Sequence, residues 1–228
     1  MASLSSLLKP LDSQVHRSKE ALPKNSHFIY VINGQKGSGK STLLLNLLGL
    51  DQFYRKHFDN IFLVSPTANN DPKFSKLINE LNDDNKYYSK CEEKTLLEII
   101  ERIESFNGGF KKRKKQPRNL LILDDCLADI PKSTQKSSLH RLVTTSRHLK
   151  LSIIITSQKF KALNTLIRCN CDVVSFFTSH NDGEKRSFCE EYSVNEEVLD
   201  AICQDNNDFL TVSFSSGKKV LFDKLDEI

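Results

Sequence analysis

Apolar and polar positions along the chain follow two alternating patterns. Short runs are almost entirely apolar, as a strand must be when both faces of its sheet are covered. These runs are residues 28–32, 61–64, 120–123, 153–155 and 173–177. Stretches with helical patterns separate these runs, over residues 43–48, 73–81, 96–106, 138–149 and 163–167. Strands that alternate with helices predict an α/β fold with a mostly parallel central sheet and helices on both faces.

The two ends of the chain depart from this alternation. Residues 209–214 alternate apolar with polar side chains, and a turn at 215–218 leads into the apolar run 220–222. That pattern is typical of an antiparallel hairpin at the edge of a sheet. Residues 1–26 show no sustained periodicity, so we expect a flexible N-terminal arm followed by a single domain over residues 27–228.

Charge and cysteine content narrow the class of protein. The net charge of +4 allows a polyanionic partner without requiring one. None of the six cysteines shows the paired spacing of a zinc site, so we expect reduced, mostly buried thiols. No apolar run is long enough to cross a membrane, and the first residues lack the apolar core of a secretion signal. These features favour a soluble protein that works inside a cell.

A glycine-rich segment directly follows the first apolar run. It satisfies the motif G-x-x-x-x-G-K-[ST], and a helical stretch begins right after it, so we expect a P-loop NTPase domain. Glycines let the backbone curl so that N–H groups face a phosphate, and the start of the helix adds its dipole. We expect Lys40 to bridge the β- and γ-phosphates of ATP and the Ser41 hydroxyl to hold Mg²⁺. The residues assigned to nucleotide binding are Gly34, Gln35, Lys36, Gly37, Ser38, Gly39, Lys40, Ser41 and Thr42.

The third apolar run ends in two acidic residues, in the sequence LLILDDC. The carboxyl end of a parallel strand lies at the edge of the sheet where the phosphate-binding segment also emerges. We therefore predict that Asp124 holds Mg²⁺ and that Asp125 activates the attacking water. The alternative is that both aspartates are solvated turn residues that cap the following helix.

The fourth apolar run ends in IIITSQ and brings Gln158 to the same edge of the sheet. We predict that the Gln158 amide senses the γ-phosphate or orients water. The alternative is an ordinary polar residue at the start of a helix.

Arg147 lies near the end of the helical stretch 138–149, off its apolar face. We predict that it reaches the γ-phosphate of a neighbouring subunit and neutralises transition-state charge there. A solvated helix face, or an interaction with the carboxyl end of the helix dipole, would equally explain its position. Arg168 and Arg141 are the reserve candidates for this role.

These segments together resemble the viral genome-packaging ATPases of the FtsK/HerA superfamily, in the branch found in poxviruses, other large DNA viruses and virophages. The resemblance extends over residues 27–180 and rests on GQKGSGKST, LVSPT, LLILDD, SRHLKLSIIITSQ and LIRCNCDVV. The first of these is generic, whereas the block from RH to SQ with its following arginine discriminates far better. The chain also lacks the DxxG and NKxD motifs of small GTPases and the LSGGQ segment of ABC cassettes.

The resemblance implies a strand order in which the Gln158 strand lies between the phosphate-loop strand and the Asp124 strand. It also implies a pentameric or hexameric ring that uses ATP and Mg²⁺ to thread double-stranded DNA into a preformed capsid, beside a capsid or vertex protein. Such a protein would work at the viral assembly site inside the host cell and could travel in the virion. Asp125 departs from the glutamate common across the superfamily, which leaves the assignment of the catalytic base open.

The densest positive charge on the chain lies in FKKRKKQPR, residues 110–118, just before the Asp124 strand. We predict an exposed loop whose side chains contact DNA phosphates in the channel of a ring, independently of base sequence. A solvated flexible loop and a nuclear-import patch are the alternatives. The residues expected to contact DNA are Lys111, Lys112, Arg113, Lys114 and Lys115.

The sequence therefore favours an ATP-driven translocase that packages a viral genome. Two other hypotheses fit the same motifs: an NTP-dependent regulatory switch, and a cellular-type helicase or conjugation ATPase of the same superfamily. Stimulation of ATP hydrolysis by double-stranded DNA separates the translocase from the switch. The short chain, without an added domain to load or unwind DNA, counts against the helicase.

Overall fold

The computed structural model describes residues 22–23, 27–109, 117–127, 130, 138–214 and 217–227. It divides into two compact units. The phosphate-loop unit comprises the described residues of 1–24, 30–55 and 156–228, and the β4 unit comprises those of 25–29 and 56–155. The predicted N-terminal arm lies outside the described residues except for Leu22 and Pro23. Its separation from one domain over residues 27–228 stays a prediction.

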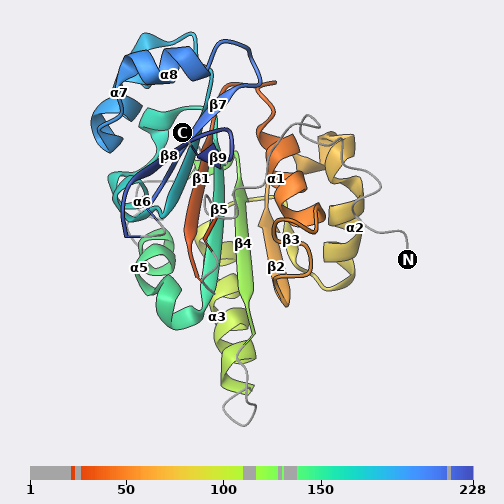
Figure 1. Cartoon of the computed structure of the whole chain (residues 1–228). Helices are drawn as coiled ribbons and strands as arrows, with labels where there is room; N and C mark the ends of the chain where they lie inside the picture. Colours follow the sequence, from red (N-terminus) through yellow and green to blue (C-terminus); the bar gives the residue numbers. More distant parts are fainter. Residues whose placement is uncertain are drawn as a thin grey trace. The chain divides into compact units, whose positions relative to one another are not determined.

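In the phosphate-loop unit, a parallel pair of strands is extended by antiparallel ones. The strands, in spatial order, are β1 (Ile29–Asn33), β6 (Val173–Phe177), β7 (Phe209–Ser213), β8 (Val220–Asp223) and β9 (Asp226–Glu227). β1 and β6 are parallel, with Ile32 opposite Ser175. From β6 to β9, each strand is antiparallel to the next one. The predicted C-terminal hairpin is therefore present as β7 and β8, and β9 continues it (Figure 1).

Aromatic side chains hold two helical segments of this unit, one in a 3-10 turn and one in an α-helix, against β6. Its helices are α1 (Lys40–Gly49), α6 (Thr165–Asn170), α7 (Asp182–Tyr192) and α8 (Glu196–Ile202), with the short 3-10 turn η6 (Phe160–Ala162). α7 packs against η6 and α8, and α8 packs against β7 (Figure 1). The ring of Phe188 in α7 lies 4.5 Å from that of Phe176 in β6 and 5.7 Å from that of Phe160 in η6, between centroids. These contacts fix η6 and α7 on β6.

Every residue of β1, β6 and β7 in this unit is buried, and three hydroxyl-bearing side chains, Tyr30, Ser175 and Thr211, lie next to one another. Tyr30 Oη and Ser175 Oγ share a hydrogen bond of 2.8 Å, and Ser175 Oγ and Thr211 Oγ1 share one of 2.6 Å. Burial raises the pKa of Tyr30 well above its ordinary value, because the charged form would be cut off from water. The three hydroxyls therefore satisfy one another across three adjacent strands.

The β4 unit is built on parallel strands. Its strands, in spatial order, are β3 (Tyr87–Tyr88), β2 (Asn60–Val64) and β4 (Asn119–Asp124). Its helices are α2 (Ser75–Asp83), α3 (Glu93–Gly109) and α5 (His140–Leu149), with the turns η2 (Ala68–Asn70) and η3 (Pro72–Phe74). α2 packs on β2 and β3, and α3 packs on α5 (Figure 1). β4 is buried along its whole length, as its apolar sequence requires.

β5 (Leu151–Ser157) has residues in both units. In the β4 unit, Asn119 N at the start of β4 donates to Lys150 O, directly before β5, over 3.3 Å. In the phosphate-loop unit, Gly34 N directly after β1 donates to Ser157 O over 3.0 Å. These are the neighbours that the resemblance implies for the Gln158 strand.

The predicted fold class is confirmed: the strands are mostly parallel, with antiparallel strands at the C-terminal end and helices around them. The sequence did not predict β3, α7 or α8. β3 consists of two half-buried tyrosines, and the two helices are rich in charged residues. Their starts are marked by Asn181 and Asn195, whose side-chain oxygens accept backbone hydrogen bonds as N-caps. Within the described part of the chain, no helix combines the length and the apolar character needed to cross a membrane.

Candidate active site

The phosphate loop, residues 34–41, joins β1 to α1 and packs on Phe177 of β6. A methyl group built onto Gly34 would lie 2.6 Å from Phe177 Cβ and 2.6 Å from Ser38 Oγ, which leaves no room for a side chain. Gly39 has a φ of +103°, a conformation that residues with a side chain rarely adopt. Packing therefore requires the first glycine of the motif, and backbone conformation requires the second.

Lys40 is turned back into the loop. Its Nζ donates to the carbonyl oxygen of Gly34 over 2.6 Å and to that of Gln35 over 2.8 Å, and the side chain is buried. A buried ammonium group favours a negatively charged partner over neutral carbonyls. The lysine is therefore positioned to exchange these carbonyls for phosphate oxygens.

Polar groups around Lys40 fit the phosphates of a nucleotide. Gly39 is the N-cap of α1 and supplies no side-chain hydrogen bond, and no acidic residue lies in the first turn. The buried hydroxyl of Ser38 has no hydrogen-bond partner among the described residues. The start of α1 thus offers backbone N–H groups and the positive end of the helix dipole to an anion. Ser41 and Thr42, both half-buried, lie in the same first turn.

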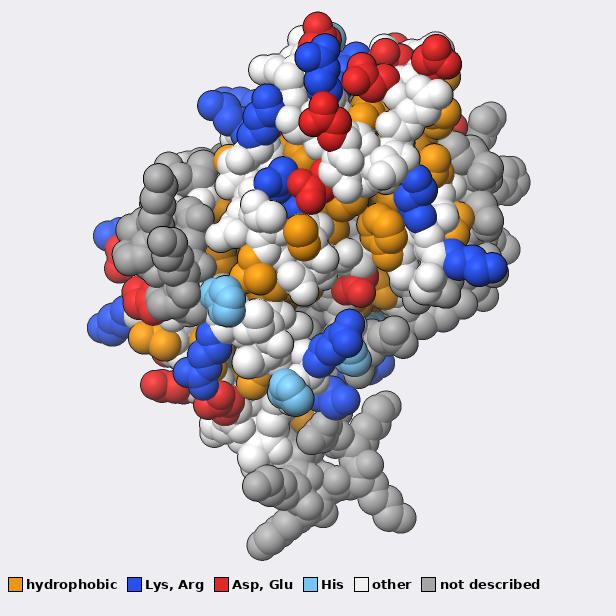
Figure 2. Space-filling model, turned by 90° about the vertical axis from the view of Figure 1, so that its left-hand side faces the viewer, with side chains coloured by type: hydrophobic (Ala, Val, Ile, Leu, Met, Phe, Trp, Pro, Cys, Tyr) orange, Lys and Arg blue, Asp and Glu red, His pale blue; other side chains and the backbone are white. Residues whose placement is uncertain are grey.

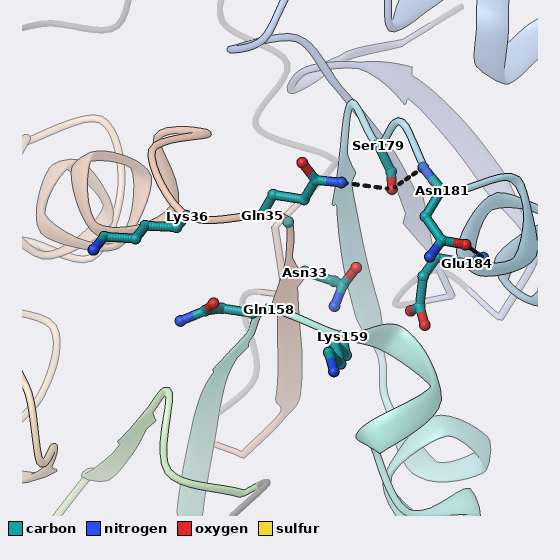
Figure 3. Close-up of a pocket in the computed structure, with 9 residues that line it drawn as sticks. Asn33, Gln35, Lys36, Gln158, Lys159, Ser179, Asn181 and Glu184 are labelled. Carbon is teal, nitrogen blue, oxygen red and sulfur yellow. Dashed lines mark hydrogen bonds between the residues drawn. The ribbon is translucent and has the colours of Figure 1, made fainter.

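A pocket of about 190 Å³ lies beside the phosphate loop (Figure 3). Gln158, at the end of β5, borders this pocket together with Gln35 and Lys36 of the loop. In Figure 3, Gln158 and Lys36 extend to the same side. The structure thus brings Gln158 next to the loop, and its role as a γ-phosphate sensor stays a prediction. The other residues that line the pocket are Asn33, Gly34, Lys159, Ser179, Asn181 and Glu184.

The pocket wall formed by Ser179, Asn181 and Glu184 was not predicted from the sequence. Ser179 Oγ accepts from Gln35 Nε2 over 3.4 Å and from Asn181 N over 3.2 Å (Figure 3). Asn181 Oδ1 accepts from Glu184 N over 3.1 Å, and Glu184 Oε2 accepts from Lys161 N over 3.1 Å. These bonds connect the phosphate loop to the start of α7. The available signal was Asn181 followed three residues later by a glutamate, a pattern typical of a helix start.

In the β4 unit, Asp124 ends β4 and is buried. Its Oδ2 accepts a hydrogen bond from Ser65 Oγ over 2.7 Å, and Ser65 Oγ accepts from Ala68 N over 3.0 Å. A fully buried serine after β2 therefore orients the carboxylate. Asp125 is half-buried and has a φ of +48°, so the chain turns sharply as it leaves the strand. The roles of both aspartates stay predictions.

The thiol next to these aspartates is held in its neutral form. A hydrogen bond with Cys91, together with burial, raises the pKa of Cys126 well above its ordinary value. A protonated, buried thiol is a poor nucleophile, so Cys126 is a packing residue of this region. All six cysteines are free, and four of them are buried, in line with the sequence.

The candidate arginines lie in different surroundings. Arg168, on α6, has its Nη1 2.8 Å from Glu191 Oε2, so its charge is paired inside its own unit. Arg141 Nη2 lies 2.8 Å from Glu104 Oε1. Arg147, in the last turn of α5, is exposed, and its side chain has no ion pair among the described residues. Which arginine acts on a neighbouring subunit stays a prediction, and accessibility favours Arg147.

The basic residues Lys111 to Lys115 lie outside the described residues, so their contact with DNA stays a prediction. Directly after that segment, Arg118 Nε lies 3.6 Å from Asp59 Oδ2. On the face drawn in Figure 2, Lys and Arg side chains are interspersed with Asp and Glu. That mixture does not by itself mark a surface for a polyanion.

Comparison with known proteins relates the chain to a described family. A model of the family described as "Poxvirus A32 protein" matches residues 14–189. "Uncharacterized protein L437" of Acanthamoeba polyphaga mimivirus is 21% identical over 168 residues, which are 72% of this chain and 56% of that protein. The chain thus spans little more than half the length of this curated relative.

Solved structures share the fold. The genome packaging NTPase B204 from Sulfolobus turreted icosahedral virus 2, in complex with AMP, has 18% identity and a TM-score of 0.64 over 86% of this chain and 97% of its own. The pCW3 conjugation coupling protein TcpA, in its monomer form with ATPγS, has 16% identity and a TM-score of 0.58 over 87% of this chain and 60% of its own. At these identities the likeness establishes the arrangement of strands and helices, and no residue roles.

Proposed function

Because the chain belongs to the poxvirus A32 protein family, we propose that it is a magnesium-dependent ATPase that drives double-stranded DNA into a viral capsid. The observation that carries the proposal is the buried Lys40 ammonium, which contacts the backbone of a glycine-rich loop. That loop leads into a helix whose first N–H groups have no side-chain cap. The fold shared with a genome packaging NTPase and with a conjugation coupling protein is compatible with the proposal.

Nucleotide binding follows from groups of the phosphate-loop unit. Lys40 exchanges the carbonyls of Gly34 and Gln35 for β- and γ-phosphate oxygens, while N–H groups at the start of α1 hold the same phosphates. Gln158, next to the loop, senses the γ-phosphate. The side chain of Gln158 therefore links the binding and hydrolysis of ATP to the end of β5.

The metal site uses oxygen donors, as Mg²⁺ prefers. The hydroxyl of Ser41 and the carboxylate of Asp124 would hold the ion, and the ion would supply positive charge to the phosphates. Asp124 fits this role because it is buried and is oriented by Ser65. Asp125 positions the attacking water as general base.

Translocation requires several copies of the chain. We place Arg147 of one subunit at the γ-phosphate of the next subunit in a pentameric or hexameric ring, which couples hydrolysis to the contact between them. Residues 111–115 contact the phosphate backbone of DNA in the ring, independently of sequence. A capsid or vertex protein anchors the ring at the viral assembly site inside the host cell.

The test is steady-state ATP hydrolysis with and without double-stranded DNA. We expect DNA to stimulate turnover in the wild type and in Lys94→Ala, an exposed lysine on α3, and turnover to vanish in Lys40→Ala. Turnover that is indifferent to DNA would favour the regulatory switch instead. Full turnover by Lys40→Ala would refute the nucleotide site itself.

A further inference from the structure

We propose that the turn formed by residues 204–208 is the nucleobase side of the nucleotide site, and that Asn207 selects adenine over guanine. This inference rests on the proposed ATPase function and names the group that determines its substrate.

Asn207 lies beside the end of the phosphate loop. A methyl group built onto Gly39 would lie 3.3 Å from Phe177 Cε1 and 3.6 Å from Asn207 Oδ1. Asn207 belongs to the same unit as the loop, and it is not one of the residues that line the Gln158 pocket. The loop therefore has two distinct flanks, with Gln158 beside its beginning and Asn207 beside its end.

A triphosphate bound to this loop has a defined direction. Lys40 reaches the β- and γ-phosphates, and Gln158 stands at the γ-phosphate. The α-phosphate, which carries the nucleoside, consequently leaves the loop on the flank away from Gln158. On that flank the side chain of Asn207 is exposed, so a base can reach it.

The turn that presents Asn207 is anchored to the end of β6. Thr178, the residue after β6, donates from its N to Asp208 O over 2.9 Å and from Oγ1 to Asp205 O over 2.6 Å. Asp205 N donates to Asp208 Oδ2 over 2.9 Å, and Lys224 Nζ lies 3.2 Å from Asp208 Oδ1. A turn closed in this way loses little conformational freedom when a ligand binds, which favours recognition by the residue it carries.

The Asn207 amide matches the edge of adenine. The amide offers one donor and one acceptor side by side, and it makes no hydrogen bond with any residue that the structure describes. Adenine presents an acceptor at N7 beside a donor at N6, whereas guanine presents two acceptors, N7 and O6. One amide can therefore pair with both groups of adenine but with only one of guanine.

The experiment measures kcat and KM for ATP and for GTP, with the adjacent exposed Asn206 as the matched control. Asn207→Ala should reduce the ratio of kcat/KM for ATP to that for GTP about tenfold, the discrimination expected of one bidentate pair. The loss should fall on KM for ATP, with kcat changed less than about twofold, because the amide binds the base and not the reacting phosphate. Asn206→Ala should keep the wild-type ratio.

Other results would overturn the inference. They are an unchanged ratio in Asn207→Ala, an equal loss in Asn206→Ala, or a wild type that uses ATP and GTP equally well. Direct binding of fluorescently labelled ADP separates this failure from failure of the proposed function. If Lys40→Ala binds ADP as tightly as the wild type, the nucleotide site is misassigned. If Lys40→Ala weakens ADP binding but Asn207→Ala does not, only the assignment of Asn207 to the base is wrong.

Discussion

Replacing Arg147 or Arg168 by alanine should have opposite consequences, although both are candidates to act on a neighbouring subunit. Arg168 pairs with Glu191 over 2.8 Å, and the two side chains are 19% and 21% exposed. Its Nη2 also donates to Thr165 Oγ1 over 3.1 Å, and its guanidinium lies 5.6 Å from the centre of the Phe160 ring. Arg168 is therefore a structural residue of its own unit, whereas Arg147 is exposed.

The stability that Arg168 contributes can be worked from these contacts. Solvent screening limits the partly exposed ion pair to about 1 kcal/mol. The contact with the aromatic ring adds about 0.5–1 kcal/mol, and the hydrogen bond to the threonine adds about 0.5 kcal/mol. Because neighbouring contacts are not additive, we expect Arg168→Ala to lower the free energy of unfolding by about 2 kcal/mol. Arg147→Ala should change it by less than about 0.5 kcal/mol.

Urea unfolding, ATP binding and ATP hydrolysis would be measured on both variants. Arg147→Ala should bind ATP nearly normally and lose about a thousandfold in turnover, as expected for an arginine that acts only on the transition state. Arg141→Ala tests the remaining candidate, and because it breaks only an exposed pair with Glu104, it should change neither stability nor turnover strongly. If Arg168→Ala is fully stable but inactive, Arg168 is the acting residue and the reasoning fails. Loss of ATP binding in Arg147→Ala would also contradict it.

Three further predictions concern the two units separately. Ser65→Ala removes the donor to Asp124, so half-maximal turnover should require about 10- to 100-fold more Mg²⁺, and an unchanged Mg²⁺ titration would show that Ser65 does not orient the carboxylate. Gly34→Ala forces a methyl group against Phe177 and should cost about 1–3 kcal/mol in thermal unfolding and weaken nucleotide binding, so normal binding would contradict the packing. Burial raises the pKa of Cys171 from 9.0 to about 12, so the unfolded thiol ionises first and stability should fall as pH rises through this interval. Urea unfolding at about pH 8 and about pH 10 should show a smaller decline for Cys171→Ala, and an equal decline would exclude that thiol as the cause.

The strands and most helices could be predicted because burial dictates their patterns directly. β1, β4 and β6 are apolar at nearly every position, and their buried residues agree with that. α7 escaped prediction because its buried side chains are few among many charges, and only its N-cap marks its start. β3 escaped because a two-residue strand carries no period, and it forms only by pairing with β2.

The phosphate loop could be predicted because its glycines, lysine and serine are consecutive in sequence. The hydrogen bonds that hold the site's side chains in place could not be predicted, because they join segments that are distant in sequence. Ser65 lies 59 residues from Asp124, and Gln35 lies 144 residues from Ser179, so no local pattern links either pair. Similarly, the sequence shows that Arg168 is basic, but only the fold shows that its charge is already paired with Glu191.

The buried hydroxyls of Tyr30, Ser175 and Thr211 constrain how the strands assemble during folding. A shift of one residue between β1 and β6 would turn each strand's side chains to the wrong face. A shift of two residues would keep the face but separate the hydroxyls, and each one left without a partner would cost about 1–3 kcal/mol. Folding intermediates in which the strands are shifted by one or by two residues are therefore both unstable. Since the phosphate loop begins one residue after β1, the alignment that satisfies the hydroxyls also brings Gly34 to Phe177, so a correctly paired sheet and a correctly placed nucleotide loop form together.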